Sequence, residues 1–277
     1  MRIALIQERQ NGLYNFHDEP RQLADAEVRS LQREMLAQNL ELIDRAAQAG
    51  ADLALTSEAI NFPGGPAWHA TSSRELVAAF QDELLSELSS AARRLGMYVV
   101  AGVLADEPAG LRNAAIVYGR DGSEVMRYHK QFLAGDENDY MVPGRGFPVW
   151  ESEFGLIGIG ICWDMQFPET ARGYARQGVD LVLAPTWGWE RYYAAARAYE
   201  NGIYVASAMV VPSYKDIDGH RRAPSQVIAP SGEALAEGPL DRADAVVVDV
   251  PDIRDCAPAR ALRMGCLRAW EDAGAAV

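Results

Sequence analysis

The chain alternates short apolar runs of strand length with longer stretches that repeat apolar residues at helical spacing. This alternation is typical of an α/β protein, in which helices cover the faces of a sheet. In the first half the expected strands are 2–7, 53–56, 97–104, 114–118 and 124–128, and the expected helices are 23–48 and 73–95. In the second half the expected strands are 155–161, 181–184, 204–210, 226–229 and 245–250, and the expected helices are 169–177 and 191–201.

The two halves match in residues as well as in order. Residues 50–55 match 178–183, and residues 96–99 match 202–205. Chance is the alternative, because a helix, a glycine and an apolar strand often follow one another in α/β proteins. A true repeat predicts one domain over 1–277, with two sheets face to face and helices on both outer faces. No Pro- or Ser-rich linker divides the chain.

Composition excludes several classes of protein. The formal net charge of −13 argues against nucleic acid or an anionic membrane as a partner, although solubility alone also explains it. Apolar runs fall short of the roughly 18–20 residues of a membrane span, and residues 1–8 turn polar too early for a signal peptide. The three cysteines have neither disulfide-framework nor zinc-type spacing. We therefore expect no metal and a reducing, cytoplasmic setting.

Cys162 stands directly after the glycine-containing apolar strand 155–161, and Pro168 begins a helix shortly afterwards. At such a turn a thiol faces backbone N–H groups, which lower its pKa and can hold an oxyanion. The alternative is a buried packing cysteine. Cys256 and Cys266 lack such a setting and are expected to be structural.

The four histidines do not identify a base for this cysteine, although a nucleophilic thiol needs one. His17 and His220 lie in polar segments that we expect to face solvent, and His69 lies in a loop. His129 adjoins Lys130 at a strand end, where neighbouring side chains point to opposite faces. His129 and Lys130 are therefore not expected in the same site.

Glu58 and Lys130 each follow an expected strand directly. Strand ends that face one way build the sites of α/β proteins, and charges there must be paired or hydrated. Each residue alone fits a solvated loop charge. Together with Cys162 they supply a base, a cation and a nucleophile.

In order and context, Glu58, Lys130 and Cys162 resemble the Glu-Lys-Cys triad of the nitrilase superfamily, the carbon–nitrogen hydrolases. Further stretches that resemble the family, out to about residue 250, are 130–133 with Glu137, 140–144, 197–201 and 225–232. The resemblance implies a four-layer αββα sandwich with an internal pseudo-two-fold repeat.

The resemblance also implies a mechanism without metal or organic cofactor. Glu58 would take the proton of Cys162, and Lys130 with the backbone N–H of Trp163 would stabilise the oxyanion. Glu137 would orient Lys130 or assist proton transfer.

The substrate expectation depends on the residues that follow the cysteine. Cys162-Trp163-Asp164 is similar to the amidase and carbamoylase branches, whereas true nitrilases usually carry Glu at the third position. Met165 and Gln166 stand where family members that act on carboxylates often place an Arg. We therefore expect a neutral or cationic amide or N-carbamoyl amine. An anionic substrate would need Arg191 or Arg221.

The remaining expectations concern pocket walls and assembly. Trp187 and Trp189 either wall the pocket beside Cys162 or pack in the core. The tail 251–277 is expected at the interface of a homodimer or larger oligomer, and the polar segment 9–21 is expected to form a surface loop or lid.

Three rival functions stay open at this stage. An N-acyltransferase would use the same residues, and a nitrilase is disfavoured by Asp164. A non-catalytic binding protein would not need all four of Glu58, Lys130, Glu137 and Cys162.

Overall fold

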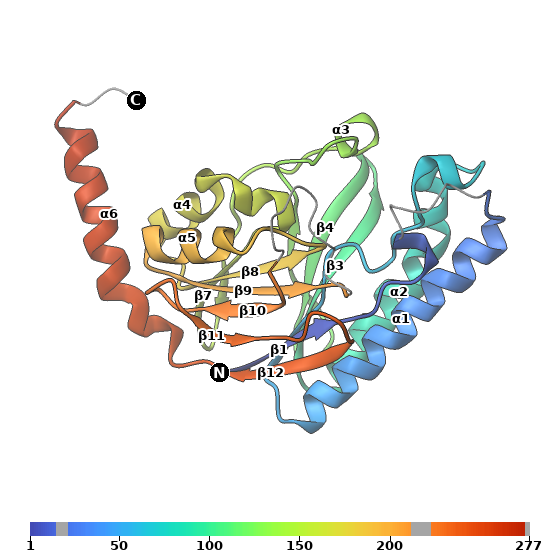
Figure 1. Ribbon diagram of the computed structural model, residues 1–277, viewed down its shortest axis with the longest axis horizontal. Coiled ribbons are helices and arrows are strands. Elements are labelled where there is room, and N and C mark those ends of the chain that lie inside the picture. The colour runs from blue at the N-terminus through green and yellow to red at the C-terminus, as the bar shows by residue number, and fades with distance from the viewer. Residues whose placement is uncertain (15–21, 212–222, 275–277) are drawn as a thin grey trace.

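The computed structural model describes residues 1–14, 22–211 and 223–274. These residues form two mixed six-stranded sheets that face each other, with helices on both outer faces (Figure 1). The expected four-layer αββα arrangement is confirmed. Arg221 lies outside the described residues, as do His17, His220 and most of the segment 9–21.

The first sheet has the order β12-β1-β2-β3-β4-β5. Its strands are β1 (Arg2–Gln7), β2 (Leu53–Leu55), β3 (Tyr98–Glu107), β4 (Gly110–Tyr118), β5 (Glu124–His129) and β12 (Asp244–Asp249). The central strands β1, β2 and β3 are parallel. The outer strands pair antiparallel with their inner neighbours.

The second sheet repeats this pattern in the order β11-β10-β9-β8-β7-β6. Its strands are β6 (Trp150–Ser152), β7 (Gly155–Ile159), β8 (Leu181–Thr186), β9 (Tyr204–Met209), β10 (Gln226–Ile228) and β11 (Ala234–Glu237). Again three central strands, β7, β8 and β9, are parallel. Antiparallel strands flank them on both sides, as in the first sheet. The repeat read from the sequence is thus a repeat of topology.

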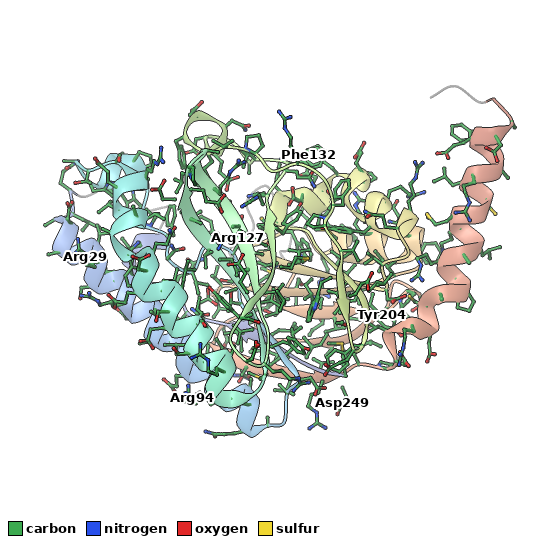
Figure 2. All side chains as sticks on the ribbon, turned by 180° about the vertical axis from the view of Figure 1, so that it is seen from behind. Arg29, Arg94, Arg127, Phe132, Tyr204 and Asp249 are labelled. Carbon is green, nitrogen blue, oxygen red and sulfur yellow. The ribbon has the colours of Figure 1, made fainter. Side chains whose placement is uncertain are left out.

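Helices α1 (Asp25–Gln48) and α2 (Ser73–Leu95) cover the first sheet, and α4 (Pro168–Arg176) and α5 (Tyr192–Asn201) cover the second. Arg29 and Arg94 lie on the outer side of the first helical layer (Figure 2). A capping box between Ser72 and Glu75 begins α2, and Gly96 ends it with φ +59°. Helix α6 (Ala257–Asp272) lies beside α4 and α5 at the edge of the molecule.

Each pair of adjacent layers encloses its own apolar cluster. Ile3, Leu55 and Ile159 belong to the cluster between the sheets, because alternate residues of each strand face the opposite sheet. Ala4 and Phe80 belong to the cluster beneath α1 and α2. Tyr174 belongs to the cluster beneath α4 and α5. Sheets buried on both faces explain why their strands read as continuous apolar runs.

Several boundaries differ from the sequence expectations. The short edge strands β6 and β11 were not expected, because they pair along one side and carry little apolar pattern. The hairpin of β3 and β4 extends to Glu107 and Gly110, past the apolar residues. In the described part of the segment 9–21, Arg9 and Gly12 are exposed as expected for a surface loop, but the Leu13 side chain is fully buried and anchors the segment to the core. In the described part of the chain no helix is long and apolar enough to span a membrane.

Candidate active site

A cavity of about 270 Å³ lies where several strands of both sheets end. The side chains at its base follow β2, β5 and β7, and the carboxyl ends of parallel strands are the usual place for a site in α/β proteins. The residues that line it are Glu58, Ala59, Phe62, Gly65, Pro66, Leu104, Asn113, Lys130, Ala134, Asp136, Glu137, Tyr140, Met141, Cys162, Trp163, Trp187 and Gly188.

The structure brings Glu58, Lys130, Glu137 and Cys162 together in this cavity. The Nζ atom of Lys130 donates to Oε1 of Glu58 at 2.7 Å and lies 2.9 Å from Oε2 of Glu137. Asn113 donates through Nδ2 to Oε1 of both glutamates, at 2.8 Å and 3.2 Å. Two carboxylates therefore share one ammonium group and one amide, which allows both to remain in a nearly dry interior.

The pKa values reflect this mutual support. Burial alone would lower the pKa of Lys130, but the charges of Glu58, Cys162 and Glu137 outweigh it and raise that pKa. Burial, with repulsion from Glu58, raises the pKa of Glu137. Lys130 thus stays a cation, which suits it to hold developing negative charge on a substrate oxygen.

Cys162 is the first residue of the 3-10 helix η3 (Cys162–Gln166) and has φ +43°, a conformation that non-glycine residues rarely adopt. Its Sγ atom lies 3.7 Å from the carbonyl oxygen of Gly188. Burial, and next the charge of Glu58, raise the pKa of the thiol to about 12, although Lys130, Thr186 and the Trp187 N–H oppose the shift. The expectation that the turn lowers the thiol pKa was wrong, because burial and the glutamate outweigh the donors.

Asp164 connects the segment around Cys162 to the segment that directly follows Lys130. Its buried carboxylate accepts hydrogen bonds from the Tyr128 hydroxyl at 2.8 Å and from the backbone N–H groups of Ile161, Gln131 and Phe132 at 2.8–3.0 Å. Lys130 and Cys162 are therefore held in fixed relation by one side chain between them.

The backbone that carries Glu58 is closely constrained. Gly102 of β3 packs against it, since a Cβ there would lie 2.3 Å from the Ser57 carbonyl oxygen and 2.9 Å from the Glu58 Cα. Ala59, the next residue, has φ +53°. Trp187 donates its backbone N–H to Oε2 of Glu58 at 3.2 Å.

The aromatic residues divide between the cavity and the core. Trp163 and Trp187 line the cavity, and Phe62 meets Trp187 edge-on with ring centroids 4.8 Å apart. Trp189 is buried in the cluster beneath α4 and α5, so the packing alternative holds for this residue. Strand β8 ends at Thr186, and side-chain alternation no longer places residues 187 and 189 on one side.

Arg191 and the described histidines lie elsewhere. Arg191 pairs with Glu237 at 2.7 Å and does not line the cavity. His129 contacts Glu107 at 2.9 Å, on the face opposite Lys130, as strand alternation predicts. His69 contacts the Thr71 carbonyl oxygen at 2.6 Å.

Sequence reasoning missed Asn113, Asp136 and Tyr140 among the lining residues. Asn113 gave a weak signal, because it is a polar residue that directly precedes the apolar run 114–118 of β4, although the charged Arg112 stands beside it. Asp136 gave none, since an acidic residue before a short helix is ordinary in surface loops. Tyr140 belongs to the family-like stretch 140–144, but that resemblance did not place its side chain at the cavity.

Residues 2–260 match the carbon-nitrogen hydrolase family, and the chain belongs to that family, within the nitrilase superfamily. The omega-amidase NIT2 of Xenopus tropicalis is 29% identical over 270 residues, which cover 88% of this chain and 95% of that protein. The crystal structure of an amidase from Nesterenkonia sp. is 30% identical with a TM-score of 0.73, covering 98% of this chain and 96% of that one.

A variant of the amidase from Nesterenkonia sp. AN1 carries the acetamide moiety of fluoroacetamide on its active-site cysteine. It is 27% identical, with a TM-score of 0.71, and the match covers 98% of this chain and 97% of that one. Family and relatives together make this chain an amidase-type hydrolase of amide carbon–nitrogen bonds.

Proposed function

We propose that the protein hydrolyses a small amide or N-carbamoyl compound and releases ammonia, with Cys162 as nucleophile and Glu58 as general base. The observation that carries this proposal is that Glu58, Lys130 and Cys162 line one cavity, where Nζ of Lys130 lies 2.7 Å from Oε1 of Glu58. The chemistry requires neither a metal nor an organic cofactor.

In the first half-reaction Glu58 removes the proton of the Cys162 thiol, and the thiolate attacks the carbonyl carbon. The high pKa of this thiol makes a base necessary, because very little thiolate exists near neutral pH. Lys130 and the backbone N–H of Trp163 stabilise the oxyanion. Glu58 then gives its proton to the leaving nitrogen, the carbon–nitrogen bond breaks, and a thioester remains.

In the second half-reaction Glu58 removes a proton from water, and the resulting hydroxide attacks the thioester carbonyl. The carbon–sulfur bond breaks, the proton returns to Cys162, and the acid product leaves. Glu137 keeps Lys130 in place through their 2.9 Å contact.

Neutral or positively charged substrates suit the described lining best. Asp136 lies at the cavity beside Tyr140, whose pKa its charge helps to raise after the larger effect of burial. The aromatic faces of Trp163 and Trp187 accommodate apolar groups and, through cation–π attraction, ammonium groups. Lys130 is the only cationic side chain among the described lining residues, and it already pairs with Glu58 and Glu137.

Ammonia release by wild-type enzyme and Cys162→Ala tests the function. The panel holds short amides, ω-amino amides, N-carbamoyl amines, N-carbamoyl amino acids and nitriles. Release that vanishes in Cys162→Ala but persists in Cys266→Ala, a change at an exposed cysteine, supports the proposal. Full release by Cys162→Ala refutes it. Acyl transfer to hydroxylamine without hydrolysis would favour a transferase.

We also propose that α5 and α6 form the interface of a homodimer. Tyr192 and Tyr199 on α5 and Leu262 and Trp270 on α6 are large apolar side chains that are 47–73% exposed in the single chain. Light scattering should show a dimer for the wild type and for the control Leu235→Glu, but a monomer for Leu262→Glu. A monomeric wild type contradicts the interface.

A cytoplasmic location stays a prediction. The three cysteines are free, as a reducing compartment would keep them. Cell fractionation tests this location.

A further inference from the structure

Glu8 holds the same position after β1 that Glu58 holds after β2. Strands β1 and β2 are parallel with Leu5 paired to Leu55, and each glutamate lies three residues beyond its leucine. Glu8 does not line the cavity, and it has no exposed surface. Its Oε1 atom accepts a hydrogen bond from the hydroxyl of Ser57, which is also fully buried.

Fold stability does not explain a carboxyl group in this place. Oε2 of Glu8 accepts no hydrogen bond from the residues that the structure describes, and Ser57 is a neutral partner. Burial raises the pKa of Glu8 to about 7, against the weaker opposing effect of the Ser57 hydrogen bond. An apolar side chain of similar size would avoid the desolvation that an ionised carboxylate suffers here.

The contacts of Glu8 instead involve the main chain next to Glu58. Ser57 directly precedes Glu58, and its carbonyl oxygen accepts a hydrogen bond from the Thr56 hydroxyl at 2.9 Å. The Glu8 carbonyl oxygen accepts the N–H of Val211 at 2.8 Å, just beyond β9 in the other sheet. Glu8 thus joins the chain segment that carries Glu58 to the sheet that carries Cys162.

We propose that Glu8 is a positioning residue for the general base: through Ser57 its carboxyl group fixes the main chain from which Glu58 reaches the thiol of Cys162. This inference rests on the proposed role of Glu58. Proton transfer requires the two groups to meet within hydrogen-bond distance, and small displacements of a catalytic group lower rates strongly. Substrate binding should be unaffected, because Glu8 and Ser57 do not line the cavity.

The experiment measures kcat, KM and thermal midpoint for Glu8→Leu, Ser57→Ala, their double variant and Glu8→Gln. We expect kcat to fall about tenfold in each of the first two and no further in the double variant, with KM unchanged. Glu8→Gln keeps an oxygen that accepts from Ser57, so its kcat should stay within about threefold of the wild type. The thermal midpoint of Glu8→Leu should equal or exceed that of the wild type.

Asp180→Asn is the control for the loss of a buried carboxylate outside the site. Asp180 pairs with Arg260 at 2.6 Å, so its removal should lower the thermal midpoint while kcat stays normal. If Glu8→Leu behaves in that way, Glu8 has a structural role only and the inference fails.

Glu58→Gln separates this inference from the proposed function. An inactive Glu58→Gln beside fully active Glu8→Leu and Ser57→Ala overturns the role of Glu8 alone. A fully active Glu58→Gln overturns the proposed base, and with it the positioning role.

Discussion

The ammonium nitrogen of Lys130 lies 2.7 Å from Oε1 of Glu58, and the two side chains are only 2% and 5% exposed. Asn113 of β4 and Glu137 of α3 (Glu137–Tyr140) complete this network. Because Lys130, Glu58 and Asn113 are nearly dry and Glu137 is largely buried, each group depends on the others for its charge or its hydrogen bonds.

Lys130→Met should lower both stability and activity. It leaves the carboxylates of Glu58 and Glu137 buried without their cation, so we expect a loss of roughly 3–5 kcal/mol in unfolding free energy. Urea denaturation measures this. Arg33→Met, which breaks an exposed pair with Glu83, should leave stability nearly unchanged. Equal effects of the two variants would contradict the buried network.

Iodoacetamide labelling should report the raised thiol pKa of Cys162. Burial and then Glu58 raise that pKa to about 12. The labelling rate of Cys162 itself, followed on its peptide in the folded enzyme, should therefore climb about tenfold per pH unit from 7 to 10 without a plateau. Glu58→Gln should label faster at a given pH, because a charge that raises the pKa is gone, yet turn over amides far more slowly. A plateau below pH 8 in the wild type would indicate a preformed thiolate instead.

Glu8 should make stability depend on pH. Its pKa is about 7 in the folded protein, against an ordinary value of 4.5 for a glutamate in the unfolded chain, so the folded state binds the proton more tightly. The stabilisation linked to that proton is fully present below pH 4.5 and is lost as pH rises through 7.

Glu8→Gln should therefore gain stability over the wild type as pH rises from 5 to 8, by on the order of 3 kcal/mol. Chemical denaturation at each pH checks this. A difference that stays constant with pH would show that Glu8 titrates normally.

Asp136→Asn should weaken binding of cationic amides selectively. Loss of one ion pair near the surface should raise KM for an ω-amino amide about fivefold and leave KM for the matched neutral amide unchanged. Asp139→Asn is the matched control, because Asp139 carries the same charge on α3 outside the cavity. Equal effects of the two variants would mean that Asp136 acts only through the general charge of the surface.

The sequence predicts the parts of this site that follow strand ends. Glu58, Lys130 and Cys162 each stand just past an expected strand, and the fold brings those strand ends together at one cavity. Position along the chain is sufficient for that inference.

Contacts between distant segments could not be predicted in the same way. The bond from Ser57 to Glu8 spans 49 positions, and the bond from Trp187 to Glu58 spans 129. The thiol pKa of Cys162 depends on the burial that such contacts create. The local turn alone therefore predicted a lowered pKa, whereas the folded protein raises it. Glu8 carried the same signal as Glu58, a carboxylate after an apolar strand, and its meaning appears only with Ser57 beside it.

The most direct measurement quenches the wild-type enzyme during turnover of a short amide and maps the added acyl mass by peptide mass spectrometry. We predict one acyl group per chain, on Cys162, which hydroxylamine removes because the link is a thioester. Cys256 and Cys266 should stay unmodified. An acyl group on another residue, or undiminished turnover by Cys162→Ala, would contradict the role of Cys162 as nucleophile.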